Sequence, residues 1–229
     1  MTTRTVCTWN AGDNGTADNL RNLMSRYDGI SLQEMGDRDG LYDAAHNYGW
    51  KSYDGDGQDG KRSTPLIWNP KRLEWKEGYA VKLSDAQTVN PGTGPEKIKT
   101  KWAIGGRFHV DGYGDAFRMV SCHLVADSSS GERNDLARKQ INRLADLWPD
   151  ADGACVIAGD LNTGWNTDLV KPLKSDGWKS CHAYEYGPYP THGDWTPDHI
   201  WTRNAKITAC GTIGNKSDHD ALWATYDLK

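Results

Sequence analysis

The chain has 229 residues, of which 25% are charged and 37% hydrophobic, and its formal net charge is −4. Mean hydropathy is −0.77, and no apolar run approaches the ~20 residues that a membrane-spanning helix needs. This length can bury a large core as one α/β domain, which we expect to cover residues 1–229. Because the N-terminus enters a strand-like segment without a secretory signal, we expect a cytoplasmic protein.

Charge and cysteine content exclude several common classes. The five cysteines are scattered and form no Cys-x-x-Cys pair, so they predict neither a disulfide framework nor a zinc site. The net negative charge is not typical of a nucleic-acid-binding protein. Local basic patches or metal ions would have to meet any polyanionic partner. We expect a monomer.

The first half of the chain alternates short strand and helix patterns. Apolar residues at helical spacing predict a helix over residues 16–27, capped by Thr16 or Asp18, and a second short helix over residues 39–48. The loop of residues 54–60 is rich in glycine and aspartate; it predicts a solvated turn, with a structural Ca²⁺ site as the alternative. Strands are predicted over residues 5–10, 29–34, 65–69 and 73–83.

The second half begins with a predicted loop over residues 84–96, and long loops in compact domains are often functional. The clearest helix covers residues 132–148 and ends at Pro149. Strands are predicted over residues 102–110, 116–123, 155–158, 198–202, 205–212 and 221–226. Many strands with few intervening helices predict packed sheets flanked by helices, rather than a doubly wound parallel sheet.

Polar side chains collect at the ends of these strands, where a rigid scaffold can present them to one cleft. Carboxylate and carboxamide oxygens suit Mg²⁺ or Mn²⁺ better than zinc. Histidines titrate near neutral pH, as acid–base chemistry requires. The set consists of Asn10, Glu34, His123, Asp160, Asn162, Asp198, Asp218 and His219.

Each position also has a structural explanation when taken alone. Asn10 and the Gly159–Asn162 segment can start turns, and His123 can be a satisfied core histidine. The Ser217–Asp220 segment can cap a helix. Glu34 is the least ordinary because it extends an apolar run. The joint occurrence of these residues, in this order, favours a functional set.

Six short motifs resemble the successive signatures of the endonuclease/exonuclease/phosphatase superfamily, the group of deoxyribonuclease I and exonuclease III. The resemblance extends from residue 8 to residue 219, and it implies a four-layered α/β sandwich with two packed mixed β-sheets flanked by helices. The motifs are Thr8-Trp9-Asn10, Leu32-Gln33-Glu34, Ser121-Cys122-His123-Leu124, Gly159-Asp160-Leu161-Asn162, Pro197-Asp198-His199-Ile200-Trp201 and Ser217-Asp218-His219.

The resemblance also implies metal-dependent chemistry. Glu34 would be the principal ligand of Mg²⁺, for which Mn²⁺ can substitute, and Asn10 and Asp218 would complete the coordination. Asp160 would activate or orient the attacking water, and Asn162 would donate to a phosphate oxygen.

Two histidines would complete this site. Asp198 would hold the ring of His219 in one tautomer. His123 is similar to the second histidine of the deoxyribonuclease I branch, a candidate general acid. That branch holds this histidine with a glutamate, but the corresponding region here, Lys61–Pro65, contains no acid.

Three basic residues are candidate phosphate contacts: Arg133, Lys101 and Arg107. The alternative for the lysines of residues 96–101 is a solvated loop. We expect a phosphodiesterase, foremost a DNA endonuclease that leaves 3′-hydroxyl and 5′-phosphate ends. The first alternative is a phosphatase or phosphodiesterase for a small or lipid phosphate ester. The second is a catalytically silent binding protein on the same fold.

Overall fold

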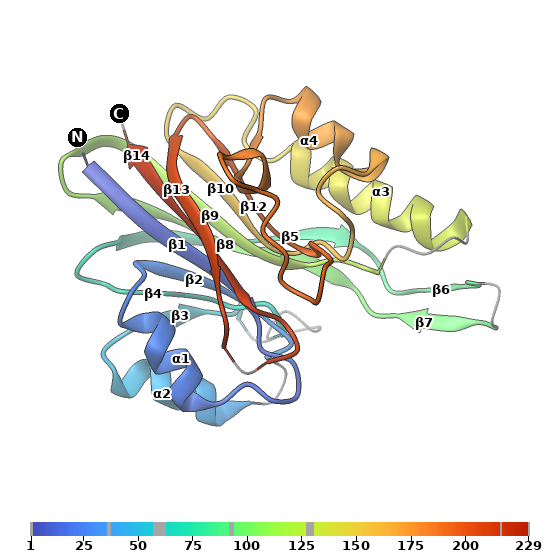
Figure 1. The fold of residues 1–229 in the computed structure, drawn as a ribbon, viewed down its shortest axis with the longest axis horizontal. Helices are drawn as coiled ribbons and strands as arrows, with labels where there is room; N and C mark the ends of the chain where they lie inside the picture. Colours follow the sequence, from blue (N-terminus) through green and yellow to red (C-terminus); the bar gives the residue numbers. More distant parts are fainter. Residues whose placement is uncertain are drawn as a thin grey trace.

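The computed structural model describes residues 2–35, 38–56, 63–91, 94–126, 131–215 and 217–228. In these residues, two six-stranded mixed sheets lie face to face (Figure 1). The first sheet has the order β13 (Lys206–Ile213), β14 (Ala221–Leu228), β1 (Thr2–Asn10), β2 (Gly29–Gln33), β4 (Leu66–Trp68) and β3 (Lys51–Tyr53). The second has the order β11 (Lys179–Ser180), β12 (Asp198–Arg203), β10 (Cys155–Asp160), β9 (Tyr113–His123), β8 (Lys101–Val110) and β5 (Glu74–Ser84).

Helices cover the outer face of each sheet. The helices α1 (Ala17–Met24) and α2 (Asp39–Asn47) pack on the first sheet, and α3 (Gly131–Ala145) and α4 (Lys171–Ser175) pack on the second. A third apolar cluster fills the space between the sheets. The prediction of a four-layered α/β sandwich is therefore confirmed. Two short 3₁₀ helices, η2 (Asp168–Val170) and η3 (Cys181–Ala183), lie in the second half of the chain.

The predicted helices form with small differences at their ends. Thr16 caps α1, since its side-chain oxygen accepts the amide of Asn19, and the Asn19 side chain accepts the amide of Thr16 in return. The helix α3 ends at Ala145, earlier than predicted, and the last turn is completed by backbone hydrogen bonds of Asp146 and Leu147.

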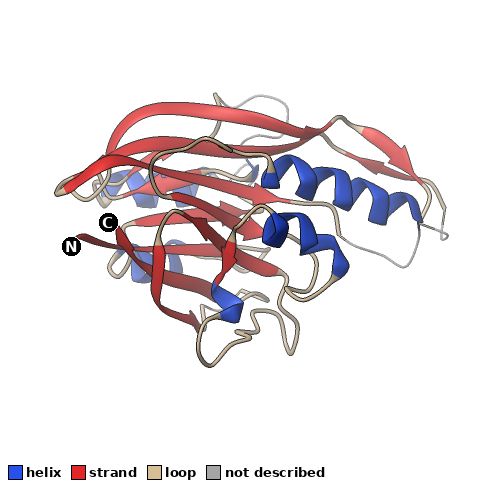
Figure 2. Cartoon of the chain, turned by 90° about the horizontal axis from the view of Figure 1, so that it is seen from above, coloured by secondary structure: helices blue, strands red, loops and turns tan. Residues whose placement is uncertain are grey.

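The prediction of a loop over residues 84–96 was wrong. Two short strands, β6 (Gln87–Val89) and β7 (Glu96–Ile98), form a hairpin there. The hairpin extends beyond the sandwich in the same direction as α3 (Figures 1 and 2). Strands of three residues give too little alternation for a sequence pattern to reveal them.

Each sheet contains one parallel pair of strands, and these two pairs position the polar set. Strand β1 runs parallel to β2, and β10 runs parallel to β9. Carboxyl ends of parallel neighbours meet at one edge of a sheet, so Asn10 lies opposite Gln33, and Asp160 opposite His123. The hydroxyls of Ser31 and Ser121, 2.8 Å apart, join the two pairs across the interior.

Two sequence features lie partly outside the described residues. These are the candidate Ca²⁺ loop, of which residues 57–60 are not described, and the Lys61–Pro65 segment, of which Lys61 and Arg62 are not described.

In the part of the chain that the structure describes, no helix is long and apolar enough to cross a membrane.

Candidate active site

Asn10 joins carboxylates from the two sheets. Its side-chain nitrogen donates to Oε1 of Glu34 at 3.1 Å and to Oδ2 of Asp160 at 3.0 Å. Its side-chain oxygen accepts the backbone amide of Gly12 at 3.0 Å. The ends of β1, β2 and β10 therefore meet at one point, although they are far apart in the sequence.

Two residues of this region have left-handed backbones. Glu34 has φ 57° and Asn162 has φ 53°. Residues other than glycine adopt this conformation at a cost, and such residues cluster at functional sites. For Glu34 the turn directs the carboxylate away from the strand and toward Asn10.

Asp160 is fully buried beside a second acid. Burial and the charge of Asp198 raise the pKa of Asp160 to about 7, although His219, Asn10 and the amide of Asn162 oppose that change. Oδ1 of Asp198 is also buried, and it has no hydrogen-bond partner among the described residues. Two buried carboxyl groups this close require a compensating positive charge.

His219 supplies part of that charge. Its Nδ1 lies 2.6 Å from Oδ2 of Asp198. Burial opposes the charged ring, but the hydrogen bond and charge of Asp198, with Asp160 and Asp218, raise the pKa of His219 to about 9. The ring is therefore an imidazolium at neutral pH, with Nδ1 fixed as a donor to Asp198.

Asp218 reaches the same place from the opposite end of the chain. Its neighbour Ser217 donates to the backbone oxygen of Asn10 at 2.8 Å and to Oδ1 of Asp218 at 3.0 Å. A Cβ at Gly12, whose φ is +46°, would lie 2.5 Å from that Oδ1. Glycine at position 12 therefore gives the carboxylate room to lie against the end of β1.

His123 lies beside Asp160 at the end of β9. Its Nε2 lies 3.7 Å from Oδ2 of Asp160. Burial, Lys101 and His219 together lower the pKa of His123 well below its usual value. The ring is therefore neutral at neutral pH and can donate a hydrogen bond without transferring a proton.

Lys101 and Arg133 lie with the predicted set. A groove of about 370 Å³ runs past His123 and Asn162, and both basic residues line it, with Lys97, Lys99 and Glu96. Burial lowers the pKa of Lys101, while Asp160 and Glu34 partly offset the effect. Arg133 forms an ion pair with Glu96, which ties α3 to the β6–β7 hairpin.

Arg107 does not lie at this site, which corrects its assignment as a phosphate contact. The register places it opposite Arg118, which pairs with Cys155 at the start of β10. Asp160 is at the other end of β10, five residues from Cys155, which corresponds to about 16 Å at 3.3 Å per residue. The guanidinium instead lies 3.2 Å from the carboxylate of Glu77 on the neighbouring strand.

Sequence reasoning missed one residue that contacts the site, Thr191, and one that only lies beside it, His192. Thr191 donates from Oγ1 to Oδ2 of Asp198 at 2.6 Å, so this oxygen holds two partners. His192 places its ring beside that of His219, with ring centroids 4.8 Å apart. Both residues lie in a loop without regular periodicity. The only sequence signal for them is that two polar residues, Thr191 and His192, precede a glycine.

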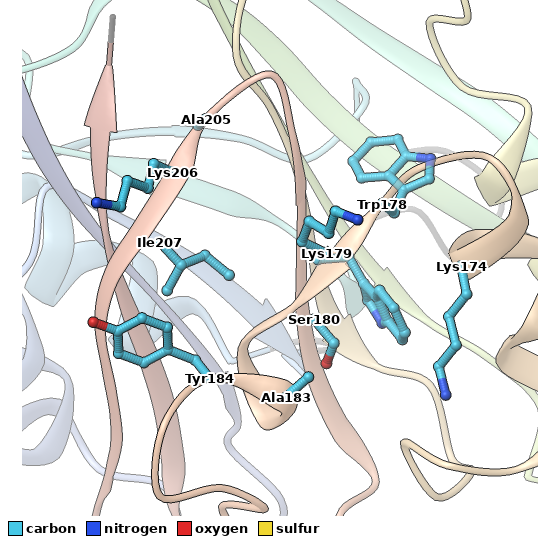
Figure 3. A pocket seen from close by; sticks show the side chains of 10 residues that line it. Lys174, Trp178, Lys179, Ser180, Ala183, Tyr184, Ala205, Lys206 and Ile207 are labelled. Carbon is cyan, nitrogen blue, oxygen red and sulfur yellow. The ribbon is translucent and has the colours of Figure 1, made fainter.

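A cavity larger than this groove lies elsewhere. It measures about 540 Å³ and opens between the edges β11 and β13 of the two sheets, with Lys179, Tyr184 and Lys206 on its walls (Figure 3). None of the predicted site residues lines it.

The polar set fits a divalent cation. Glu34, Asp160 and Asp218 offer carboxylate oxygens, and Asn10 offers an amide, which is the donor set of hard ions such as Mg²⁺. Asp160, Asp198 and His219 also each place one ligand atom within 4.8 Å of the others. The uncompensated Oδ1 of Asp198 and the raised pKa of Asp160 are consistent with a cation at this point.

Residues 7–219 match the model of the Endonuclease/Exonuclease/phosphatase family. The chain belongs to this family. The chain is accordingly a phosphoric ester hydrolase, and enzymes of this family are typically metal-dependent. No curated protein sequence matches the chain.

Solved structures of this family share the fold at low sequence identity. A Bacteroides vulgatus endonuclease/exonuclease/phosphatase has a TM-score of 0.77 and 15% identity, with 100% of each chain covered. A Bacteroides thetaiotaomicron mannosyl-6-phosphatase has a TM-score of 0.72 and 14% identity, with 99% of each chain covered. The D. rerio TDP2 protein, solved with a single-strand DNA product, has a TM-score of 0.71 and 16% identity, with coverage of 99% of this chain and 100% of that one.

Proposed function

We propose that the protein is a Mg²⁺-dependent nuclease that cleaves DNA to 3′-hydroxyl and 5′-phosphate ends. The observation that carries this choice among phosphoric esters is the groove beside His123 and Asn162. Four cationic side chains and one acid line it. A small ester needs only the site itself, whereas a polymer needs cations along its path to contact further phosphates.

Glu34, Asn10 and Asp218 would hold the ion. When bound, Mg²⁺ stabilises the negative charge that gathers on the phosphate oxygens. The side-chain nitrogen of Asn10 donates to Glu34 and to Asp160, so Asn10 would also orient these two carboxylates at the ion.

The protein's own groups would divide the proton chemistry. Asp160, with a pKa near 7, would take the proton of the attacking water. His219, which is protonated at neutral pH, would give its Nε2 proton to the leaving 3′ oxygen, because its Nδ1 is engaged by Asp198. Asn162 and neutral His123 would donate to the other oxygens without becoming charged.

The structure of TDP2 with a single-strand DNA product supports the nuclease hypothesis by similarity of fold, and the mannosyl-6-phosphatase supports the alternative in the same way. The basic groove favours the polymer. The net charge of −4 does not contradict it, because the cations are gathered where the chain would pass.

The test is a panel of substrates in Mg²⁺: supercoiled plasmid, single-stranded DNA, RNA and sugar phosphates. We expect nicking of the plasmid or cleavage of single-stranded DNA, abolished by EDTA. Release of phosphate from sugar phosphates without cleavage of any nucleic acid would contradict the proposal and favour the small-ester alternative.

A further inference from the structure

His192 is held rigidly beside the site although it belongs to none of the six motifs. The backbone oxygen of Thr191 accepts the amide of Asp220 at 2.7 Å, and the Thr191 side chain donates to Asp198. His192 itself pairs with Trp195 across a short bridge. The loop is thereby fastened to β12 and to the Ser217–Asp220 segment, so His192 stays next to His219.

The rings of His192 and His219 share one pattern of hydrogen bonding. Nδ1 of His192 lies 3.0 Å from the backbone oxygen of Asp218. Because a carbonyl oxygen can only accept, Nδ1 carries the proton and Nε2 of the neutral ring keeps its lone pair. Nδ1 of His219 is likewise engaged, by Asp198. Histidines that bind metal ions almost always anchor their second nitrogen to a carboxylate or carbonyl in this way.

Asp218 completes a donor set with these two rings. One ligand atom from each of His192, Asp218 and His219 lies within 4.8 Å of the others. Two imidazoles and one carboxylate suit Zn²⁺ and similar transition metals, whereas Mg²⁺ prefers oxygen ligands throughout. We propose that His192, Asp218 and His219 form a binding site for one transition-metal ion, with Zn²⁺ as the best fit.

The proposed Zn²⁺ site differs from the proposed magnesium site because it includes His192. Glu34 and Asn10 take no part, and His192 takes no part in the hydrolysis. Asp218 also belongs to the proposed magnesium site, and His219 belongs to the proposed proton chemistry, so a bound Zn²⁺ ion would withdraw both residues from the reaction. We therefore expect Zn²⁺ to inhibit the hydrolysis in the presence of Mg²⁺. This inhibition rests on the proposed function, whereas the binding of Zn²⁺ does not.

Binding is tested on the metal-free protein with Co²⁺ as a coloured probe, followed by displacement with Zn²⁺. His192→Asn is the informative variant, because its amide can still donate to the Asp218 carbonyl but offers no imidazole nitrogen. We expect one Co²⁺ per wild-type chain and a Zn²⁺ dissociation constant raised at least about tenfold in the variant. His46→Asn is the matched control, since His46 is exposed and its ring lies 2.9 Å from the Ser52 hydroxyl, remote from the predicted site residues; it should bind like wild type.

Inhibition is measured by titrating Zn²⁺ into the reaction with excess Mg²⁺. The His192→Asn variant should keep the activity of wild type without Zn²⁺, and its inhibition midpoint should rise by the same factor as its dissociation constant. Wild-type protein that binds no Co²⁺ or Zn²⁺, or a variant that binds Zn²⁺ as tightly as wild type, would overturn the proposal. If no substrate is cleaved under any condition, the proposed function fails, and the Co²⁺ measurement still decides this one.

Discussion

Oδ2 of Asp198 lies 2.6 Å from Nδ1 of His219 and accepts a second hydrogen bond of 2.6 Å from Thr191. This carboxylate is completely buried, so it interacts with His219 without competition from water. The pair fixes which nitrogen of His219 faces the substrate and keeps the ring charged at neutral pH.

Asp198→Asn should remove that control. Without the hydrogen bond and charge of Asp198, only Asp160 and Asp218 still oppose the effect of burial, so the pKa of His219 should fall from about 9 toward its ordinary value. NMR titration of the ring in EDTA measures this directly, and kcat should fall at least about tenfold. Asp194→Asn, an exposed acid of the same loop, is the control and should change neither. An unchanged titration of His219 in the Asp198 variant would refute the assigned pairing.

The same pair predicts how stability depends on pH. His219 has a higher pKa in the folded protein than its ordinary value of 6.5, so the folded state binds its proton more tightly than the unfolded state. The stabilisation is complete below pH 6.5 and is lost as the pH rises through about 9. In thermal unfolding of the metal-free protein, the melting temperature should therefore decrease as the pH rises from 6.5 to about 9. In Asp198→Asn this slope should largely disappear; an equally steep slope would place its origin in other groups.

Replacing the groove lysines should weaken the binding of a nucleic-acid polymer but leave the hydrolysis of a small substrate unchanged. In the double variant Lys97→Gln/Lys99→Gln, the affinity for single-stranded DNA should depend less on salt, with the slope of log affinity against log salt smaller by about 1 to 2. Hydrolysis of a small phosphodiester should be unaffected, because these residues lie outside the polar set. Lys179→Gln/Lys206→Gln, which alters the remote cavity of Figure 3 by the same charge, is the matched control. Equal effects of the two double variants would indicate non-specific electrostatics.

Gly159 is expected to tolerate no side chain. An added Cβ would lie 2.1 Å from the backbone oxygen of Cys122 on the neighbouring strand, so Gly159→Ala would push β9 and β10 apart. We expect a loss of about 1–3 kcal/mol in the free energy of unfolding, together with reduced activity because Asp160 moves. Gly114→Ala has nothing within 4 Å of the new Cβ and should behave like wild type in chemical denaturation.

The architecture could be predicted from the sequence because hydrophobic periodicity and the order of the motifs are enough to indicate it. The strands that end at Asn10, Gln33 and Asp160 are long or apolar enough to be recognised, and the six motifs placed their polar ends in one site. The short β6–β7 hairpin was missed because its composition resembles a loop. Arg107 was misassigned because a charge near a site in the sequence does not reveal the strand register.

Contacts made by irregular segments were also beyond the sequence. Thr191 and His192 reach Asp198 and Asp218 through a loop whose path is set by tertiary hydrogen bonds. The neutral state of His123 arises from burial and from Lys101, and neither can be read from the Ser121–Leu124 motif.

We propose that the carboxyl ends of the two parallel strand pairs build one metal-dependent hydrolytic site around Glu34. The most direct measurement is the Mg²⁺ dependence of plasmid and single-stranded DNA cleavage by Glu34→Gln. Glu77→Gln, a remote glutamate paired with Arg107, serves as the control. We predict that Glu34→Gln lowers kcat/KM at least about 100-fold at saturating Mg²⁺ without altering the melting temperature by more than a few degrees, while Glu77→Gln retains wild-type activity. A Glu34→Gln variant that cleaves DNA as fast as wild type, with the same Mg²⁺ requirement, would show that Glu34 does not hold the ion.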